Sequence, residues 1–284
     1  MALINNQGEP ISKWWITKGL QIIKIDRQIF SSSNLRRARC EFIAGSNRLG
    51  TIKSWLSAAQ LIQNGKNSRE HELTDFGLAI SKNDSRLDKS ATWWAFHLAL
   101  CFSEDSQPYP SFFTSLENVS KDWMKSKDIF SKLLGVLKQE NGDSYSDSTM
   151  ESSLSSVRRM FKDDRPLEDL GLIEIKEKEF IRLGSPKLTD EIIAHAVARM
   201  KFHCFKSRPS VSFSEVTQTG LAHFLCCSND ELRKHLRRME QSNNWKSCFS
   251  FTEAVNVDSV SFGQECDPQT TVLKLLQSGK DTWL

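Results

Sequence analysis

The sequence predicts a mainly α-helical protein with small β-hairpins. Apolar residues recur at helical spacing in several segments, and between them lie short alternating stretches with turn residues such as Asn64-Gly65. The order helix, helix, turn, helix, hairpin occurs in residues 11–81, with weaker echoes after residue 127. That order is typical of a winged helix-turn-helix, so we expect winged helix-turn-helix modules packed around a helical core.

Length and composition predict three regions. The chain has 284 residues, which at roughly 150 residues per domain corresponds to about two domains or several small modules. We expect a winged helix-turn-helix domain in residues 1–82, a helical connecting region in residues 83–141 and a C-terminal winged-helix-like α+β region in residues 142–284. The modules resemble each other in element order, since no residue-level repeat relates them.

Periodicity and capping residues define the elements of the first region. The expected elements are a helix over residues 14–25, a second helix capped by Ser33 or Asn34, a third capped by Ser46 or Asn47, a hairpin at Asn64-Gly65 and a short closing helix capped by Thr74. Trp55 falls on the apolar face of the third helix, so we expect its side chain to be a core anchor.

The connecting region is the most apolar part of the chain. Residues 92–102 carry Trp93, Trp94 and Phe96 around His97 and leave little polar face. We therefore expect a buried central helix with Trp94 as a second core anchor. A single histidine in such a helix is usually a hydrogen-bonded core residue, and this is our interpretation of His97.

The C-terminal region repeats helices and hairpins. The expected elements are a helix over residues 128–140, a helix opened by a Ser148–Glu151 capping box, a hairpin in residues 171–184, helices over residues 189–203 and 213–227, a helix opened by a Ser228–Glu231 capping box, and a hairpin formed by residues 249–251 and 255–262.

Positive charge is concentrated at the N-terminus. Residues 1–82 hold 12 Lys and Arg against 6 Asp and Glu, a net charge of +6, whereas the whole chain has +3. Such a field attracts phosphate backbones or acidic partners, and the third helix and the wing are the parts of this motif that touch a duplex. The candidate nucleic-acid-binding residues are Arg36, Arg37, Arg39, Arg48, Thr51, Lys53, Lys66 and Arg69. The alternative is a solvated helix face without a ligand.

Two further basic clusters rank second. They are Arg158-Arg159 and the cluster from Arg233 to Arg238, and acidic neighbours dilute the charge of both.

Cysteine spacing and hydropathy indicate the compartment. Seven scattered cysteines favour free thiols in a reducing cytosol over a disulfide framework, so we expect a cytoplasmic protein. No apolar run reaches the roughly 18 residues that a membrane span requires, which excludes a membrane role. Adjacent Cys226 and Cys227, with His203 and His223 elsewhere, lack zinc-site spacing, so no metal site is predicted.

Catalytic motifs are scarce. The chain contains no GxxxxGK[ST], GxGxxG or GxSxG sequence. Nucleases often use carboxylates and a lysine to hold a metal and activate water, and the only local echo is Asp169 with Glu174 and Lys176. Alternation of polar and apolar residues along a hairpin strand would produce the same pattern.

A family resemblance covers nearly the whole chain. It is carried by Trp15, Lys18-Gly19, Gly45-Ser46-Asn47-Arg48, Ile52-Lys53-Ser54-Trp55-Leu56, Leu61-Ile62, Leu73-Thr74-Asp75-Phe76-Gly77, Asp88-Lys89-Ser90-Ala91-Thr92-Trp93-Trp94, His97 and the run from Pro166 to Ile173. In these residues the chain resembles the bacterial family of unknown function that contains SspB, the DNA-nicking component of DNA phosphorothioation defence systems.

The resemblance implies a role and partners. It implies a DNA-binding, DNA-nicking subunit that works with a cysteine desulfurase and a nucleotide-using sulfurtransferase component, which replace a phosphate oxygen of DNA with sulfur. A divalent metal such as Mg²⁺ is expected if the chain nicks DNA. Two alternatives stay open, a non-catalytic adaptor that presents DNA to the sulfur-transfer enzymes and a transcriptional regulator. The oligomeric state stays open, with a homodimer as one alternative.

Overall fold

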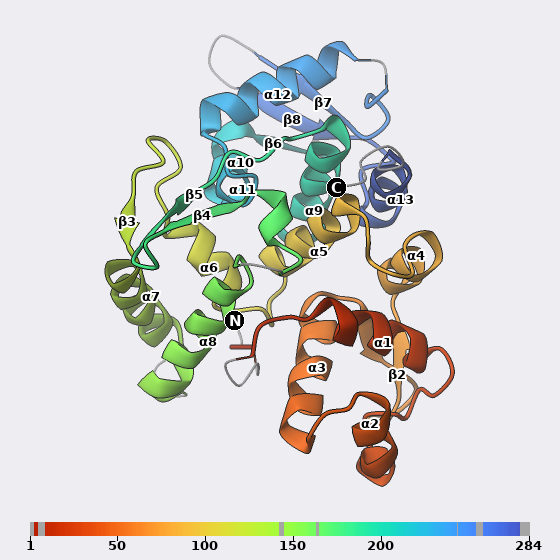
Figure 1. Ribbon diagram of the computed structural model, residues 1–284. Helices are drawn as coiled ribbons and strands as arrows, with labels where there is room; N and C mark the ends of the chain where they lie inside the picture. Colours follow the sequence, from red (N-terminus) through yellow and green to blue (C-terminus); the bar gives the residue numbers. More distant parts are fainter. Residues whose placement is uncertain are drawn as a thin grey trace.

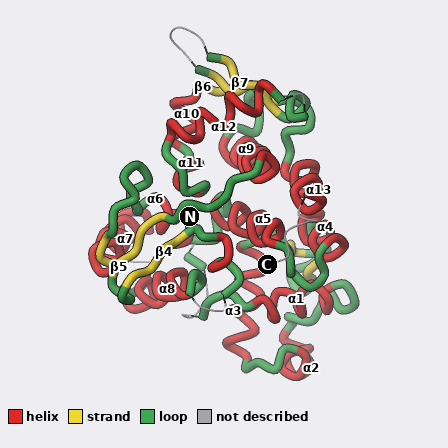
Figure 2. Tube along the Cα trace, turned by 45° about the horizontal axis from the view of Figure 1, so that its top comes forward, coloured by secondary structure: helices red, strands yellow, loops and turns green. Residues whose placement is uncertain are grey.

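Helices make up most of the chain. The computed structural model describes residues 3–4, 9–141, 145–162, 165–242, 244–253 and 258–278. Within these residues, short strands form small antiparallel sheets, as the sequence predicts. In Figure 2 the labelled strands lie at the top and on the left of the molecule, among helices and loops.

The elements follow each other in the order of Figure 1. The helices are α1 (Lys13–Ile23), α2 (Leu35–Glu41), α3 (Ser46–Ala58), α4 (Asp75–Asn83), α5 (Ser90–Cys101), α6 (Tyr109–Thr114), α7 (Ser126–Asn141), α8 (Asp147–Arg159), α9 (Asp190–Cys204), α10 (Phe213–Gln218), α11 (Leu221–Phe224), α12 (Asn229–Gln241) and α13 (Pro268–Ser278), with short 3₁₀ turns η1 (Ser32–Asn34) and η3 (Glu168–Leu170). The strands are β1 (Ile62–Asn64), β2 (His71–Leu73), β3 (Met124–Lys125), β4 (Ile173–Lys176), β5 (Phe180–Leu183), β6 (Ser210–Ser212), β7 (Phe249–Thr252) and β8 (Ser259–Phe262).

The N-terminal elements α1, α2, α3, β1 and β2 lie together at the lower right of Figure 1. Strands β1 and β2 pair antiparallel, with Ile62 opposite Leu73, which confirms a hairpin here. The loop between them spans residues 65–70 and is closed by a hydrogen bond from the Gly65 N–H to the Glu70 carbonyl (2.8 Å), so Asn64-Gly65 is not a two-residue turn.

The predicted helix caps have mixed outcomes. Thr74 caps α4 by accepting a hydrogen bond from the Gly77 N–H (3.0 Å), and the Ser228–Glu231 capping box opens α12, both as predicted. Helix α3 instead follows Gly45, which has no capping side chain. Helix α8 is capped by Ser146 rather than Ser148, because the chain turns into the helix two residues earlier.

Helix α5 lies at the centre of the hydrophobic core. Trp94 on this helix and Trp55 on α3 are 4% and 1% exposed, which confirms both as core anchors. His97 is fully buried, and its Nε2–H donates to the Phe224 carbonyl (2.8 Å) while its Nδ1 accepts from the Tyr109 hydroxyl (2.8 Å). Burial lowers the pKa of His97 to about 4, although the bond to Phe224 opposes this. His97 is therefore a neutral, hydrogen-bonded core residue, as expected.

Helix α13, for which the sequence predicts no element, lies against helices from all three predicted regions. It packs against α9, α4 and α5, and Lys89 donates to the Leu276 carbonyl (3.1 Å). Arg199 of α9 makes a second connection, since its buried guanidinium donates to Gln60 and lies over the Phe76 ring (4.5 Å). One continuous apolar core runs through all three predicted regions. The division at residues 82/83 and 141/142 stays a prediction.

Each of the two C-terminal hairpins gains a third strand. The orders are β3-β5-β4 and β6-β8-β7, and β3 and β6 come from distant parts of the chain. The predicted helix over residues 213–227 is split into α10 and α11 at Gly220, whose positive φ (+80°) favours glycine. Of the predicted strand over residues 255–262, residues 255–257 lie outside the described part of the chain.

Candidate nucleic-acid interface

The candidate basic residues lie on three elements: α2, α3 and the loop between β1 and β2. The segment between α1 and α2 connects these elements. Asp26 in this segment pairs with Arg37 at the start of α2 (3.0 Å), while Gln28 donates to Glu70 at the end of the hairpin loop (3.3 Å). The Arg27 carbonyl accepts from the His71 N–H (2.8 Å). These contacts place α2 and the hairpin loop on either side of one short segment.

Helix α2 contributes two free cations. Arg36 and Arg39 are exposed, and neither forms an ion pair within the described chain, whereas Arg37 is paired with Asp26. The helix is short and only Ala38 is buried along it, so the arginine side chains extend into solvent. An unpaired exposed arginine can contact a phosphate without first losing a protein partner.

Helix α3 contributes less than the sequence suggests. Arg48 pairs with Glu9 (3.1 Å), and its guanidinium lies over the Trp15 ring (5.6 Å). Lys53 is half-buried, and its charge adds to burial in lowering the pKa of the neighbouring His71. The α3 cations are therefore partly engaged within the protein.

Thr51 is a wrong prediction. Its side chain is 0% exposed, and its hydroxyl lies 3.4 Å from the Asn47 carbonyl of the preceding turn, which accepts its hydrogen bond. The reason is that Thr51 lies four residues before Trp55 and so shares its buried face, because α3 packs against both α1 and α2. Thr51 cannot contact DNA in this conformation.

The hairpin loop contributes two more free cations. Lys66 and Arg69 are exposed and form no ion pair within the described residues. The loop itself is ordered by polar contacts: Asn67 donates to the Glu70 carboxylate (3.0 Å) and accepts from the Arg69 N–H (3.0 Å). We name Arg36, Arg39, Lys66 and Arg69 the N-terminal basic surface.

The second-rank basic clusters are engaged with acceptors. On α12, three arginines are paired: Arg233 with Asp258 (3.1 Å), Arg237 with Glu253 (2.5 Å) and Arg238 with Asp190. Arg158 donates to the Lys178 carbonyl, and Arg159 lies 3.9 Å from Glu9. These pairs neutralise most of the positive charge that the sequence places there.

The three weak catalytic candidates lie on two different elements. Glu174 and Lys176 share one face of β4, but Glu174 accepts two hydrogen bonds from Arg182, from Nε (2.9 Å) and Nη2 (2.7 Å). Asp169 lies on η3 and lines a different place, a pocket of about 310 Å³ beside Asp88 and Lys13, which pair at 2.5 Å. The ion pair to Arg182 agrees with the alternative interpretation of Glu174 as a strand-face residue.

Metal ligands do not cluster in the described residues. No three His, Cys, Asp or Glu side chains there lie close enough to hold a metal ion. Cys226 and Cys227 are buried free thiols, and burial raises the pKa of Cys227 to about 12, which keeps it protonated. The carboxylates of the described residues therefore do not fit a magnesium site.

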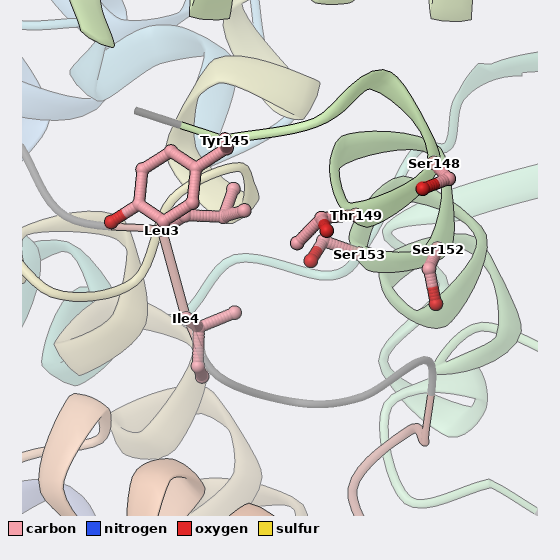
Figure 3. A pocket seen from close by; sticks show the side chains of 7 residues that line it. All are labelled: Leu3, Ile4, Tyr145, Ser148, Thr149, Ser152 and Ser153. Carbon is pink, nitrogen blue, oxygen red and sulfur yellow. The ribbon is translucent and has the colours of Figure 1, made fainter. Parts of the chain in front are cut away.

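A pocket of about 610 Å³ with apolar and hydroxyl-bearing walls lies between the N-terminal residues and the start of α8 (Figure 3). It is lined by Leu3, Ile4, Tyr145, Ser148, Thr149, Ser152 and Ser153. Figure 3 shows the hydroxyl side chains along one side of α8, across from Leu3 and Tyr145. None of these lining residues is charged, so the pocket offers no electrostatic attraction for phosphate and we assign it no role in DNA binding.

No described helix has both the length and the apolarity to cross a membrane.

Comparisons with known proteins agree with this fold. A magnesium ion-bound SspB crystal structure superposes with a TM-score of 0.77 at 15% identity, covering 99% of this chain and 88% of that chain. A second SspB crystal structure gives a TM-score of 0.75 at 14% identity with the same coverage. At these identities the likeness shows the fold alone. A comparison with curated proteins finds no match.

The family model described as "Protein of unknown function (DUF4007)" matches residues 10–277. This match spans all the helices from α1 to α12 and nearly all of α13. It confirms the family resemblance that the sequence motifs carry. The chain therefore belongs to the DUF4007 family.

Proposed function

We propose that this protein is a DNA-binding subunit of a bacterial DNA phosphorothioation system and that the N-terminal basic surface contacts the duplex. The observation that carries the proposal is that Arg36, Arg39, Lys66 and Arg69 are exposed and have no ion-pair partner among the described residues, in the region that holds a net charge of +6. The family resemblance and the SspB-like fold support the pathway. In that pathway its partners are a cysteine desulfurase and a nucleotide-using sulfurtransferase component.

The element order supports a winged-helix interpretation of this region. Helices α1, α2 and α3 precede the β1–β2 hairpin, and in a winged helix the third helix and the hairpin meet the DNA. Here the free cations belong to the second helix and the hairpin loop. The proposed contact is therefore mainly with phosphates, which gives affinity without sequence selectivity.

The salt dependence of duplex binding tests the proposal. The full chain is titrated against a labelled 30-base-pair duplex at increasing KCl, as wild type and with Arg36, Arg39, Lys66 and Arg69 changed to Gln. Since each phosphate contact contributes about 0.9 to the slope of log K against log salt, the four changes should lower the slope by up to about 3.6. The matched control changes Arg233, Lys234, Arg237 and Arg238 to Gln and should leave the slope near that of the wild type. An unchanged slope in the folded N-terminal variant rules this surface out.

Two roles differ in whether this chain itself cuts DNA. The family resemblance favours nicking. Two observations favour an adaptor that presents DNA: Glu174 is paired with Arg182, and Asp169 lies on a different element from Glu174 and Lys176. Incubation of the purified protein with supercoiled plasmid and Mg²⁺ separates these roles. If nicking occurs and Glu174→Gln and Lys176→Ala both keep full activity, these two residues are not the catalytic ones. Plasmid that stays supercoiled supports the adaptor.

A further inference from the structure

The three-stranded sheet β3-β5-β4 carries aromatic and basic side chains on one face. Antiparallel pairing places Lys125 opposite Phe180, Phe180 opposite Lys176, and Arg182 opposite Glu174. Side chains alternate along a strand, so these residues share one side of the sheet. We name this side the outer face, formed by Trp123, Lys125, Glu174, Lys176, Phe180 and Arg182.

The opposite side of the sheet is buried. Ile181 and Leu183 of β5 are 0% exposed, and Ile173 of β4 is 9% exposed. All three belong to the main hydrophobic core. The sheet is therefore fixed from behind, and its outer face is a rigid surface.

The Arg182 guanidinium lies over the Trp123 ring on this face. Its guanidinium carbon lies 4.4 Å from the centroid of the Trp123 ring. The two hydrogen bonds from Nε and Nη2 to Glu174 fix the orientation of the guanidinium. The Trp123 side chain is nevertheless 38% exposed. An exposed tryptophan and a planar guanidinium held in place present flat π-surfaces of the kind on which nucleobases stack.

The charge of the outer face is positive. Glu174 is neutralised by Arg182, while Lys125 and Lys176 are exposed and form no ion pair among the described residues. Lys121 lies two residues before Trp123 in the chain, and its ammonium donates a hydrogen bond to the Ser185 hydroxyl (3.0 Å). Cations beside an exposed aromatic ring are the combination that binds a single-stranded nucleic acid, because the bases stack and the phosphates pair with lysines.

We propose that the outer face binds single-stranded nucleic acid, with a base stacked on the Trp123–Arg182 pair and phosphates at Lys125 and Lys176. Duplex DNA does not suit it, because paired bases keep their faces inside the stack. The surface is separate from the N-terminal basic surface: in Figures 1 and 2 the sheet lies on the left of the molecule, away from α2. This site does not depend on the proposed duplex contact.

Binding of the full chain to a labelled 15-nucleotide dT strand tests the proposal. Trp123→Ala should weaken this binding at least about fivefold, since stacking contributes about 1–3 kcal/mol per base. The matched control is Trp14→Ala, which removes another exposed tryptophan (46% exposed, on α1) and should leave dT binding unchanged. Trp123→Phe keeps an aromatic face and should retain most of the affinity. Thermal melting checks that all variants are folded.

Two further measurements complete the test: the salt dependence of dT binding and the affinity for duplex DNA. Lys125→Gln with Lys176→Gln should lower the salt slope for dT by up to about 1.4, since single strands contribute about 0.7 per contact. Duplex affinity should be unchanged in both the Trp123→Ala and the double lysine variant, while the N-terminal variant should lose duplex but not dT binding. The proposal is overturned if the wild type does not bind dT, or if Trp123→Ala binds it as well as Trp14→Ala does. It is also overturned if Trp123→Ala changes only self-association in sedimentation, which would make this face a protein interface.

Discussion

The N-terminal basic surface and helix α12 lie at opposite ends of the molecule, and they differ in what surrounds their cations (Figure 1). Helix α12 carries four basic residues within six positions, a larger number than any six-residue stretch of the N-terminal region holds. Three of the four are paired with carboxylates from α9 and from the residues flanking β7 and β8. At the N-terminal end, four cations on α2 and the hairpin loop have no such partners within the described residues.

This difference shows that the number of basic residues is a poor measure of a binding surface. A paired arginine must give up its carboxylate before it binds a phosphate, and the two exchanges nearly cancel. A free arginine displaces only water and counterions, so its whole electrostatic gain is available for binding. The charge of a region therefore predicts a partner only after the local pairs are subtracted.

The comparison requires a rigid N-terminal region, and Trp55 tests that requirement. Its ring is 1% exposed and its Nε1–H donates to the Glu9 carbonyl (3.1 Å). Trp55→Ala should lower the free energy of unfolding by about 3–5 kcal/mol, because it leaves a cavity and removes one of the two hydrogen bonds that the Glu9 carbonyl accepts. Urea unfolding measures this, with the exposed Ser57→Ala on the same helix as the control, which should change stability by less than about 0.5 kcal/mol. Equal small effects in both would show that α3 is not held by this core.

A lower pH should reduce the stability of the fold without changing the charge of the arginines in either region, since arginines keep their charge at pH 5. The folded pKa of His97, about 4, lies below the unfolded value of 6.5, so the unfolded chain binds the proton first as pH falls. The contribution of His97 is fully present above pH 6.5 and is lost between pH 6.5 and about 4. The loss of this contribution should lower the free energy of unfolding by on the order of 2 kcal/mol between pH 7.5 and pH 5. Urea unfolding of His97→Gln should lose less stability over this range than the wild type, and equal losses would contradict the assignment.

Freeing the α12 arginines should weaken the contrast between the two ends. Asp190→Asn with Glu253→Gln removes the carboxylates that hold Arg238 and Arg237. If the ion pairs are what prevents the α12 arginines from contacting phosphates, the salt slope for duplex binding should rise by up to about 1.8, the value for two new phosphate contacts. The same variant with Arg237→Gln and Arg238→Gln added should return to the wild-type slope. No rise would mean that α12 faces away from the duplex, whatever its pairing.

The smallest expected effect concerns α3. Arg48→Ala with Lys53→Ala should lower the slope by about one, less than two free cations would give, because Glu9 and Trp15 already hold Arg48. Binding is measured with the same duplex as the other variants. A decrease as large as that of the four-residue variant would move the interface from α2 to α3.

Local patterns in the sequence predicted most elements but not how they meet. Strong periodicity placed α5 and α9 within two residues of their bounds, and the Ser228–Glu231 capping box placed the start of α12. Strands β3 and β6 were missed because two or three residues carry no pattern of their own and pair with partners far along the chain. The inward position of Thr51 was available from its spacing to Trp55. The ion pairs of α12 were not, because Asp190, Glu253 and Asp258 reach it only through the tertiary fold.

The position of α13 has a consequence for synthesis. A chain made from its N-terminus completes α4 and α5 long before Leu276 exists, yet Lys89 reaches the Leu276 carbonyl in the finished fold. The apolar sides of α4 and α9 that α13 covers, through buried residues such as Val272 and Leu275, therefore stay uncovered until α13 emerges from the ribosome. Contacts across nearly 190 residues also make folding slow relative to a helical bundle of the same size with local contacts. The nascent chain therefore exposes this apolar surface to aggregation until α13 is made.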